Sequence, residues 1–197
     1  YKIKRDSDNN VSYRARLVAR GFTQREGVDY SETFAPVVRH STLRLLIALT
    51  IELGLKITHL DVKAAFLNGY LEENVYMRQP EGFVTKGFEN KVCKLNRAIY
   101  GLKQSSRTWN KRVDEILLNL GCDKSKYEPC LYTRKHNGLI SIIALYVDDF
   151  FVFSNDVKYV DFLKQQLNLE FKIKDLGEAR QCLGVRIRRD YKKNTIT

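Results

Sequence analysis

The sequence lacks the residue patterns that build disulfide scaffolds, zinc sites and membrane spans. Its four cysteines, Cys93, Cys122, Cys130 and Cys182, lie far apart, and no Cys-x-x-Cys pair occurs. The three histidines complete no zinc-binding spacing. We therefore expect reduced, buried thiols, as in cytosolic or nuclear proteins. No apolar run approaches the ~18 residues of a membrane span, and the chain contains no internal repeat or low-complexity tract.

Methionine is also scarce, since Met77 is the single one in a chain that opens at Tyr1 without a visible signal peptide. We therefore expect a segment of a longer protein, in which missing targeting signals carry little weight. The 197 residues leave room for one large domain or two small ones. A hydrophobic content of 44% is typical of a globular protein and excludes a disordered chain.

Acidic residues are in the minority. The chain has 34 Lys and Arg against 23 Asp and Glu, a net charge of +11. Such a basic domain favours a polyanionic partner, most often nucleic acid. The alternative is a basic surface that contacts only water.

Hydrophobic periodicity predicts a mixture of strands and helices. Strands are expected at 11–20, near 55–61, in 75–83, twice within 131–147 and near 181–188. Helices are expected from Ser41 as N-cap to about Leu53, over 105–120 and over 157–171. The first helix is apolar nearly all round, so it should be buried. Asn137-Gly138 predicts a tight hairpin turn. Without a βαβ rhythm, the predicted class is α+β with an antiparallel sheet.

The N-terminal segment is strongly basic. Lys4 precedes a polar turn at 5–10, and Arg14 and Arg16 share one face of the strand that follows. A hairpin of this kind could bind phosphates. It could equally be an exposed edge hairpin, because edge strands carry Lys and Arg against aggregation.

Two adjacent carboxylates interrupt the most apolar stretch, ALYVDDFFVF at 144–153. Asp148 and Asp149 are predicted at the tight turn between two apolar strands, where an isolated Asp-Asp pair is most often simply solvated. Asp61 ends another apolar strand and could meet that turn. Convergent carboxylates require a cation, and Mg²⁺ prefers carboxylate and phosphate oxygens. In a basic protein, this pattern favours phosphoryl transfer on a nucleic acid.

Five segments together resemble the reverse transcriptase of Ty1/copia-type retrotransposons, as found in copia-like Pol polyproteins. They are YRARLVARGFTQREGVDYSETFAPVVR (13–39), HLDVKAAFLNGYLEENVYMRQPEGF (59–83), VCKLNRAIYGLKQSSRTW (92–109), LYVDDF (145–150) and FKIKDLGEARQCLGVRI (171–187). They span almost the whole chain in the order of the family, which makes the set highly specific.

The resemblance implies the fingers and palm of a right-handed polymerase, with an antiparallel palm sheet packed on helices and the thumb absent. Fingers elements are expected at about 1–56 and 75–110, interleaved with palm elements at about 57–74 and 111–197. The implied activity is RNA-directed DNA polymerisation, in which a primer 3′-hydroxyl attacks a deoxynucleotide on an RNA or DNA template. Two Mg²⁺ ions, with Mn²⁺ as a substitute, are the implied cofactors.

The resemblance also assigns metal and nucleotide residues. Asp61 and Asp148 would bridge the two ions, with Asp149 more peripheral. The backbone N–H groups of Val62, Lys63, Ala64, Ala65 and Phe66 would face the incoming triphosphate. Phe66 matches the bulky position that excludes a ribose 2′-hydroxyl. Without the family motif, it would read as an ordinary core residue.

Further positions follow from the same resemblance. Tyr100 and Gly101 would contact the nucleotide, and Ser106 stands where the family usually has proline. Template or primer contacts would come from Lys103, Gln104, Tyr146, Leu183 and Gly184. Basic residues on the triphosphate would be Lys4, Arg14 and Arg16. Lys174 matches a lysine that protonates the departing pyrophosphate, or it is a solvated surface lysine.

Two rival functions stay open. One is an inactive retrotransposon relic that at most binds nucleic acid. The other is a template-independent nucleotidyltransferase, against which YGLKQS at 100–105 argues, because the family uses that loop around a templated base pair. The expected partners are template–primer, deoxynucleotides, and the integrase and RNase H modules of the parent polyprotein. The expected location is a virus-like particle in the cytoplasm, or the nucleus. No membrane is expected as a partner.

Overall fold

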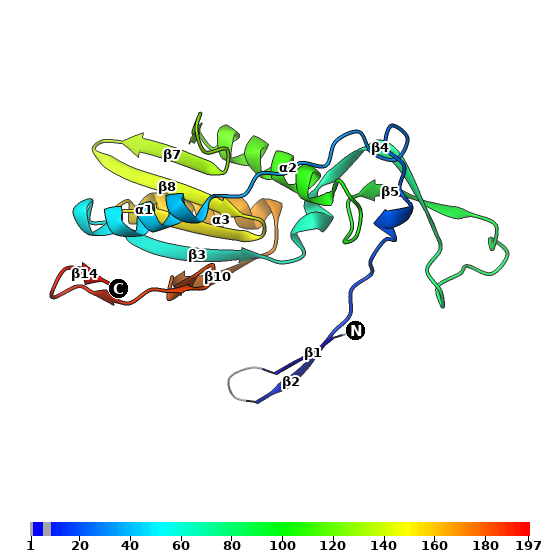
Figure 1. Cartoon of the computed structure of the whole chain (residues 1–197), viewed down its shortest axis with the longest axis horizontal. Helices are drawn as coiled ribbons and strands as arrows, with labels where there is room; N and C mark the ends of the chain where they lie inside the picture. The colour runs from blue at the N-terminus through cyan, green and yellow to red at the C-terminus, as the bar shows by residue number, and fades with distance from the viewer. Residues whose placement is uncertain (1, 6–8) are drawn as a thin grey trace. The chain divides into compact units, whose positions relative to one another are not determined.

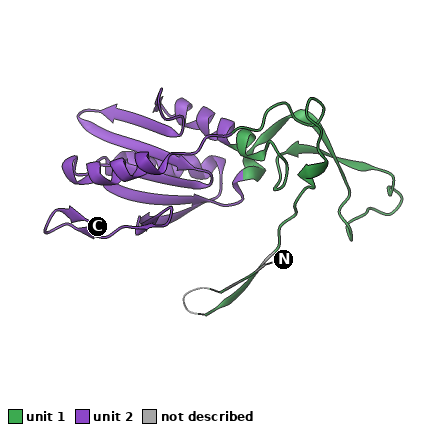
Figure 2. Cartoon of the chain, in the orientation of Figure 1, with its two compact units in different colours: residues 1–34, 66–109 green, residues 35–65, 110–197 purple. Residues whose placement is uncertain are grey.

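The computed structural model describes residues 2–5 and 9–197, without the side chains of Lys2, Lys4 and Arg14. The chain forms two compact units, shown in different colours in Figure 2. Unit 1 comprises Tyr1–Phe34 and Phe66–Trp109, and unit 2 comprises Ala35–Ala65 and Asn110–Thr197. Residues 35–56, expected among the fingers elements, group with unit 2. Most of the predicted polar turn at 5–10 lies outside the described residues.

Unit 2 is built on a six-stranded sheet with the order β10-β3-β9-β8-β7-β6 (Figure 1). Its strands are β3 (Lys56–Val62), β6 (Asp123–Lys124), β7 (Leu131–His136), β8 (Leu139–Tyr146), β9 (Asp149–Ser154) and β10 (Ile173–Glu178). Every neighbouring pair is antiparallel. The predicted α+β class with an antiparallel sheet is therefore confirmed.

Two tight hairpins, β7–β8 and β8–β9, fix the register in the middle of this sheet. Asn137 and Gly138 join β7 to β8 with φ of +49° and +76°, as a type I′ turn requires at both central positions. Phe150 and Phe153 of β9 are fully buried, and five consecutive residues of β8 from Ser141 are buried as well. The centre of the sheet is therefore covered on both faces, which explains the nearly continuous apolar run.

The α-helices among the described residues are α1 (His40–Glu52), α2 (Ser105–Asn119) and α3 (Val157–Glu170). The chain enters α2 in unit 1 and leaves it in unit 2. In unit 2, Arg112 of α2 pairs with Glu170 of α3 at 2.5 Å. Asp156 caps α3 by accepting a hydrogen bond from the Tyr159 backbone N–H. The two helices predicted at 105–120 and 157–171 are confirmed.

Helix α1 differs from the prediction at its start and on its surface. Arg39, not Ser41, is the N-cap residue, and no side chain caps the helix. Leu43 and Leu46 are buried, but Leu45 is 59% exposed. The prediction of a helix buried all round was therefore wrong, because only one of its faces packs on the unit.

Unit 1 contains two small hairpins and a short helix. They are β1 (Lys2–Arg5) with β2 (Val11–Arg14), β4 (Tyr70–Arg78) with β5 (Val92–Arg97), and the 3₁₀ helix η1 (Gly21–Thr23). A small apolar cluster of Ala19, Val75, Ile99 and Leu102 forms its core. The strand predicted over 11–20 ends at Arg14, and β5 was not predicted.

The chain between and beyond these elements forms short pieces. They are η2 (Ala65–Asn68), β11 (Gln181–Cys182) paired with β12 (Val185–Arg186), and β13 (Arg189–Asp190) paired with β14 (Thr195–Ile196). The strand predicted near 181–188 is thus broken, because Leu183 and Gly184 turn the chain with φ of +45° and +85°. Strand β10 was also missed. No helix of the described residues is long and apolar enough to cross a membrane.

Candidate active site

Four of the predicted site residues lie side by side across four strands of the unit 2 sheet. Asp61 of β3 stands opposite Asp149 of β9 on one side and opposite Lys174 of β10 on the other. Tyr146 of β8 stands opposite Asp149. Directly opposed residues of antiparallel strands share a face of the sheet. These four residues, which we call the carboxylate row, therefore place two acidic residues between a lysine and a tyrosine.

The turn beside this row holds the third aspartate. Val147 and Asp148 are the two turn residues, and the Val62 backbone N–H donates to the Asp148 carbonyl oxygen at 2.9 Å. Val147 has φ of +53°, a conformation that is strained for a β-branched residue. The prediction placed both aspartates in the turn. That was wrong for Asp149, because the β3–β9 ladder extends to it.

Asp149 has a close partner that the sequence did not reveal. The His59 ring N–H at Nε2 donates to Asp149 Oδ1 at 2.6 Å, since an ionised carboxylate can only accept. The His59 ring also stacks on Phe151, with centroids 4.6 Å apart and planes 23° apart. His59 lies two residues before Asp61 on the same strand, so strand alternation places both on one face. That spacing from Asp61 was the only sign in the sequence that His59 lies near the predicted site.

The donor set fits a hard divalent cation in its chemistry. Asp61 and Asp149 supply carboxylates from adjacent strands, and Asp148 adds another from the turn. Carboxylate oxygens are the ligands that Mg²⁺ takes. Among the described residues, no three His, Cys, Asp or Glu side chains are already grouped to hold a metal ion. A bound cation would therefore have to draw these carboxylates together.

An open hollow of about 440 Å³ borders the carboxylate row within unit 2. His59 and Asp149 line it, together with Arg180 and the turn residues Leu183 and Gly184. Cys182 is buried between Gln181 and Leu183 in sequence, and burial and then the Asp149 charge raise the pKa of its thiol to about 12. Leu183 and Gly184, which were predicted to contact template or primer, therefore line one hollow with Asp149.

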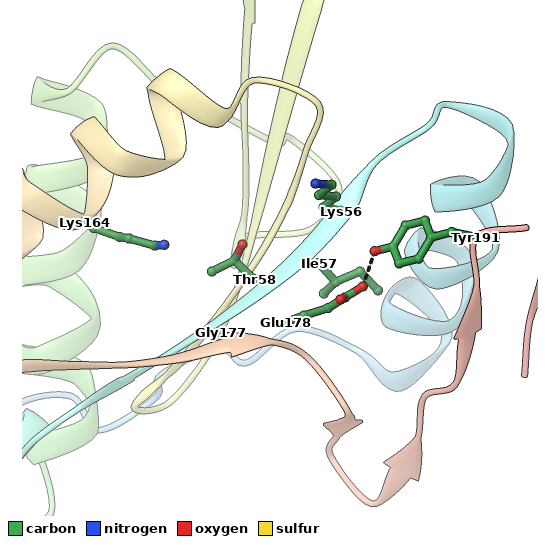
Figure 3. Close-up of a pocket in the computed structure, with 7 residues that line it drawn as sticks. All are labelled: Lys56, Ile57, Thr58, Lys164, Gly177, Glu178 and Tyr191. Carbon is green, nitrogen blue, oxygen red and sulfur yellow. Dashed lines mark hydrogen bonds between the residues drawn. The ribbon is translucent and has the colours of Figure 1, made fainter.

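A second hollow lies along β3 and β10, again within unit 2 (Figure 3). Two of its polar side chains bind each other, and a third pairs with a residue outside the lining. Tyr191 donates a hydrogen bond to Glu178, and Lys164 pairs with Asp175 at 2.8 Å. Paired groups of this kind do not form a catalytic set.

In unit 1, two glycines allow the backbone at 19–21 to cross the predicted nucleotide loop at 100–104. The Ala19 N–H donates to the Tyr100 carbonyl oxygen at 2.7 Å. A Cβ on Gly101 would lie 2.2 Å from the Ala19 carbonyl oxygen, and a Cβ on Gly21 would lie 1.9 Å from that of Gly101. Only glycine fits both positions, and Gly101 also has φ of +92°.

Three predicted nucleotide residues gather beside this crossing. The rings of Phe66 and Tyr100 lie 4.9 Å apart between centroids and are tilted by 57°. The Arg16 guanidinium lies 4.8 Å from the centroid of the Tyr100 ring, a cation–π arrangement. An aromatic pair with a cation on one ring could bind both the sugar and the charge of a nucleotide.

The predicted template residues Lys103 and Gln104 differ in their surroundings. Gln104 is 1% exposed, and its amide donates to the Asp29 carbonyl oxygen at 2.8 Å while accepting from the Gln24 amide at 3.0 Å. The Gln104 amide is therefore used to hold the loop, and its predicted contact with the template stays a prediction. Lys103 is exposed and donates to the Tyr30 hydroxyl at 3.0 Å.

Two of the backbone N–H groups predicted to face a triphosphate already have backbone partners. The Val62 N–H donates to Asp148, and the Lys63 N–H donates to the Lys172 carbonyl oxygen at 2.9 Å. Both donors are therefore used in holding β3 to its neighbours. The side chains of Lys4 and Arg14 lie outside the described part of the structure, so their predicted role stays a prediction.

The antiparallel sheet with a carboxylate row and an aspartate turn agrees with the family match. A family model described as "Reverse transcriptase (RNA-dependent DNA polymerase)" matches residues 1–197. The chain therefore belongs to the reverse transcriptase family.

Its relatives are proteins of transposons. The chain is 43% identical over 96% of its length to the "Retrovirus-related Pol polyprotein from transposon TNT 1-94" of Nicotiana tabacum. It is 38% identical over 94% of its length to that from transposon RE1 of Arabidopsis thaliana. A "Putative transposon Ty5-1 protein" of Saccharomyces cerevisiae is 37% identical over 65% of the chain and 42% of its own length. The chain spans only 14% and 13% of the two Pol polyproteins. The predicted Ty1/copia resemblance is confirmed.

Proposed function

We propose that the chain is the segment of a copia-like Pol polyprotein that performs RNA-directed DNA polymerisation. The carboxylate row is the observation that carries this proposal, because it aligns Asp61 and Asp149 in register at the end of two buried strands. The primer 3′-hydroxyl attacks the α-phosphate of a deoxynucleotide in line, and pyrophosphate leaves. Unit 2 serves as the palm and unit 1 as the fingers.

Asp61, Asp148 and Asp149 are the residues that would hold Mg²⁺. When bound, the cation supplies a lowered pKa for the primer hydroxyl and charge neutralisation for the triphosphate. The chain itself contributes placement: the buried strands β3 and β9 fix Asp61 and Asp149, and the tight turn fixes Asp148. Lys174, beside Asp61, is placed to neutralise charge that develops on the leaving group.

Unit 1 contributes selection of the nucleotide. Phe66 is half-buried with its ring against Tyr100, so it presents a fixed wall to the sugar. A wall at that position leaves no room for a ribose 2′-hydroxyl. Arg16, held on the Tyr100 ring, supplies positive charge for the triphosphate.

The net charge of +11 suits a protein that holds a template–primer by its phosphates without reading sequence. The names of the relatives support a parent polyprotein. Within it, integrase and RNase H modules would be neighbours, and virus-like particles would be the place of action.

Primer extension on poly(rA)/oligo(dT) with dTTP and Mg²⁺ tests the proposal. The wild-type protein should extend the primer, and Asp148→Asn should reduce the rate by about 100-fold or more, since a charged group at the reacting centre is lost. Asp161→Asn on the exposed side of α3 is the matched control and should extend at the wild-type rate. Nucleic-acid binding without any extension would support the relic instead.

A second test addresses the sugar. Phe66→Val should increase the use of ribonucleotides relative to deoxynucleotides by about 10-fold or more, because removal of the ring opens space for one oxygen. The ratio of kcat/KM for UTP and dTTP measures this. An unchanged ratio would remove Phe66 from the selection of the sugar.

A further inference from the structure

We propose that His59 is a positioning residue, which orients the Asp149 carboxylate for cation binding. The inference rests on the proposed function, since it assumes that Asp149 takes part in holding Mg²⁺. His59 has no place in the mechanism given above. It nevertheless contacts the carboxylate row directly, through a hydrogen bond to Asp149.

The hydrogen bond itself is short and fixed by the sheet. His59 Nε2 lies 2.6 Å from Asp149 Oδ1. In the β3–β9 ladder, His59 stands opposite Phe151 and Asp61 stands opposite Asp149. His59 and Asp149 are thus diagonal neighbours on one face, within reach of a long side chain. The register therefore sets the contact.

The other contact holds the imidazole ring. Phe151 is 1% exposed, and the His59 ring stacks on it with centroids 4.6 Å apart. The His59 and Asp149 side chains are 18% and 27% exposed. A ring held by stacking and hydrogen-bonded at its edge has little freedom to swing away from the carboxylate.

This arrangement has a consequence for the cation. Because Oδ1 accepts from His59, the Asp149 carboxylate is held in one orientation and keeps Oδ2 for another partner. A carboxylate that is already oriented loses less conformational freedom when it binds a cation. Partners that orient a ligand in this way typically change metal affinity by 10–100-fold when they are removed. His59 would act on Mg²⁺ only through Asp149.

Two substitutions separate the hydrogen bond from the stacking. His59→Phe keeps an aromatic ring against Phe151 but removes the donor, and His59→Gln restores a donor of similar reach. His136→Gln, at an exposed position of β7, is the matched control. The measurements are the dissociation constant for Mn²⁺ by electron paramagnetic resonance, and the Mg²⁺ concentration for half-maximal primer extension.

We expect His59→Phe to weaken Mn²⁺ binding by about 10-fold. The Mg²⁺ concentration for half-maximal primer extension should rise by the same factor. His59→Gln should stay within about 3-fold of wild type, because it restores the donor. His136→Gln should change neither value. A double variant His59→Phe/Asp149→Asn should bind Mn²⁺ no more weakly than Asp149→Asn alone, because the two residues act as a unit.

The outcomes distinguish this inference from the proposed function. Wild-type protein that extends primers while His59→Phe binds Mn²⁺ normally would overturn the inference alone. Wild-type protein that neither binds Mn²⁺ nor extends primers would overturn both. If His59→Phe fails to fold, the ¹⁵N resonance of His59 Nε2 in the Asp149 variants still shows whether His59 contacts Asp149. It should shift in Asp149→Asn and stay in Asp161→Asn, and a resonance unchanged in both would refute the contact.

Discussion

The two units hold their candidate functional residues by different means. In unit 2, the hydrogen-bonded ladders of β10, β3, β9 and β8 set the positions of the carboxylate row. In unit 1, the loop at 100–105, which is predicted to contact the nucleotide, is held by one close backbone crossing and by the buried Gln104 amide. One unit relies on many repeated contacts, and the other relies on a few specific ones.

This difference shows where each unit is vulnerable. A one-residue slip in the unit 2 sheet would move every side chain to the opposite face, so burial of both faces strongly opposes it. Unit 1 has few buried apolar side chains, among them the cluster of Ala19, Val75, Ile99 and Leu102. Single substitutions at its crossing should therefore loosen the loop, whereas unit 2 should resist all but substitutions in its core.

The largest expected loss of stability comes from Phe150→Ala in unit 2. Phe150 is fully buried, so its truncation should cost about 4 kcal/mol through lost burial and the cavity left behind. Leu102→Ala in the smaller core of unit 1 should cost about 2 kcal/mol. Hydrogen exchange of the amides in each unit measures both values. A larger effect for Leu102→Ala would reverse the comparison.

The next effect tests the glycine crossing in unit 1. Gly101→Ala should cost about 3 kcal/mol, because its Cβ would meet the Ala19 carbonyl oxygen at 2.2 Å in a left-handed backbone conformation. Gly27→Ala, at φ of +76° with nothing within 4 Å, should cost only about 1 kcal/mol. Thermal or denaturant unfolding compares the pair. Equal losses would mean that backbone conformation, and not the close crossing, requires glycine at Gly101.

A smaller effect is expected at the buried amide. Gln104→Ala should cost about 2 kcal/mol, because the Gln24 amide and the Asp29 carbonyl oxygen lose a buried partner. Gln165→Ala on the exposed surface of α3 is the control and should change stability by less than about 0.5 kcal/mol. A Gln104→Ala variant as stable as the control, but defective on template, would support the predicted template contact.

The smallest perturbation is chemical labelling of the four free cysteines. Cys93 of unit 1 is partly exposed, whereas Cys122, Cys130 and Cys182 of unit 2 are buried. Burial raises the pKa of the Cys130 thiol to about 11, so few thiolates form near pH 8. Iodoacetamide at pH 8 should therefore label Cys93 first, as peptide mass spectrometry would show. Earlier labelling of Cys130 would show that unit 2 opens more readily than unit 1.

Local patterns predicted much of unit 2. The apolar spacing of 105–120 and 157–171 gave two helices, and Asn137-Gly138 gave the type I′ turn, since each signal lies within a few residues. The placement of Asp61 beside Asp149 on neighbouring strands was also foreseen. Both apolar strands end at these aspartates, so strand ends alone brought them together.

The remaining features depend on contacts distant in sequence. Strand β10 reads as a charged loop and becomes a strand only because it pairs with β3. The His59–Asp149 bond spans 90 residues, and the Gln104–Asp29 bond spans 75 residues. Such tertiary pairings leave no local pattern, which is why the contact of His59 with Asp149 and the hydrogen bonds of the Gln104 amide were not predicted.

The most direct measurement is primer extension by Asp61→Asn, because Asp61 stands between Lys174 and Asp149 in the carboxylate row. The substitution keeps the size of the side chain and removes its charge. The account predicts a loss of about 100-fold or more in rate, with an unchanged unfolding midpoint and wild-type activity in Asp161→Asn. Extension by Asp61→Asn at the wild-type rate would contradict the account.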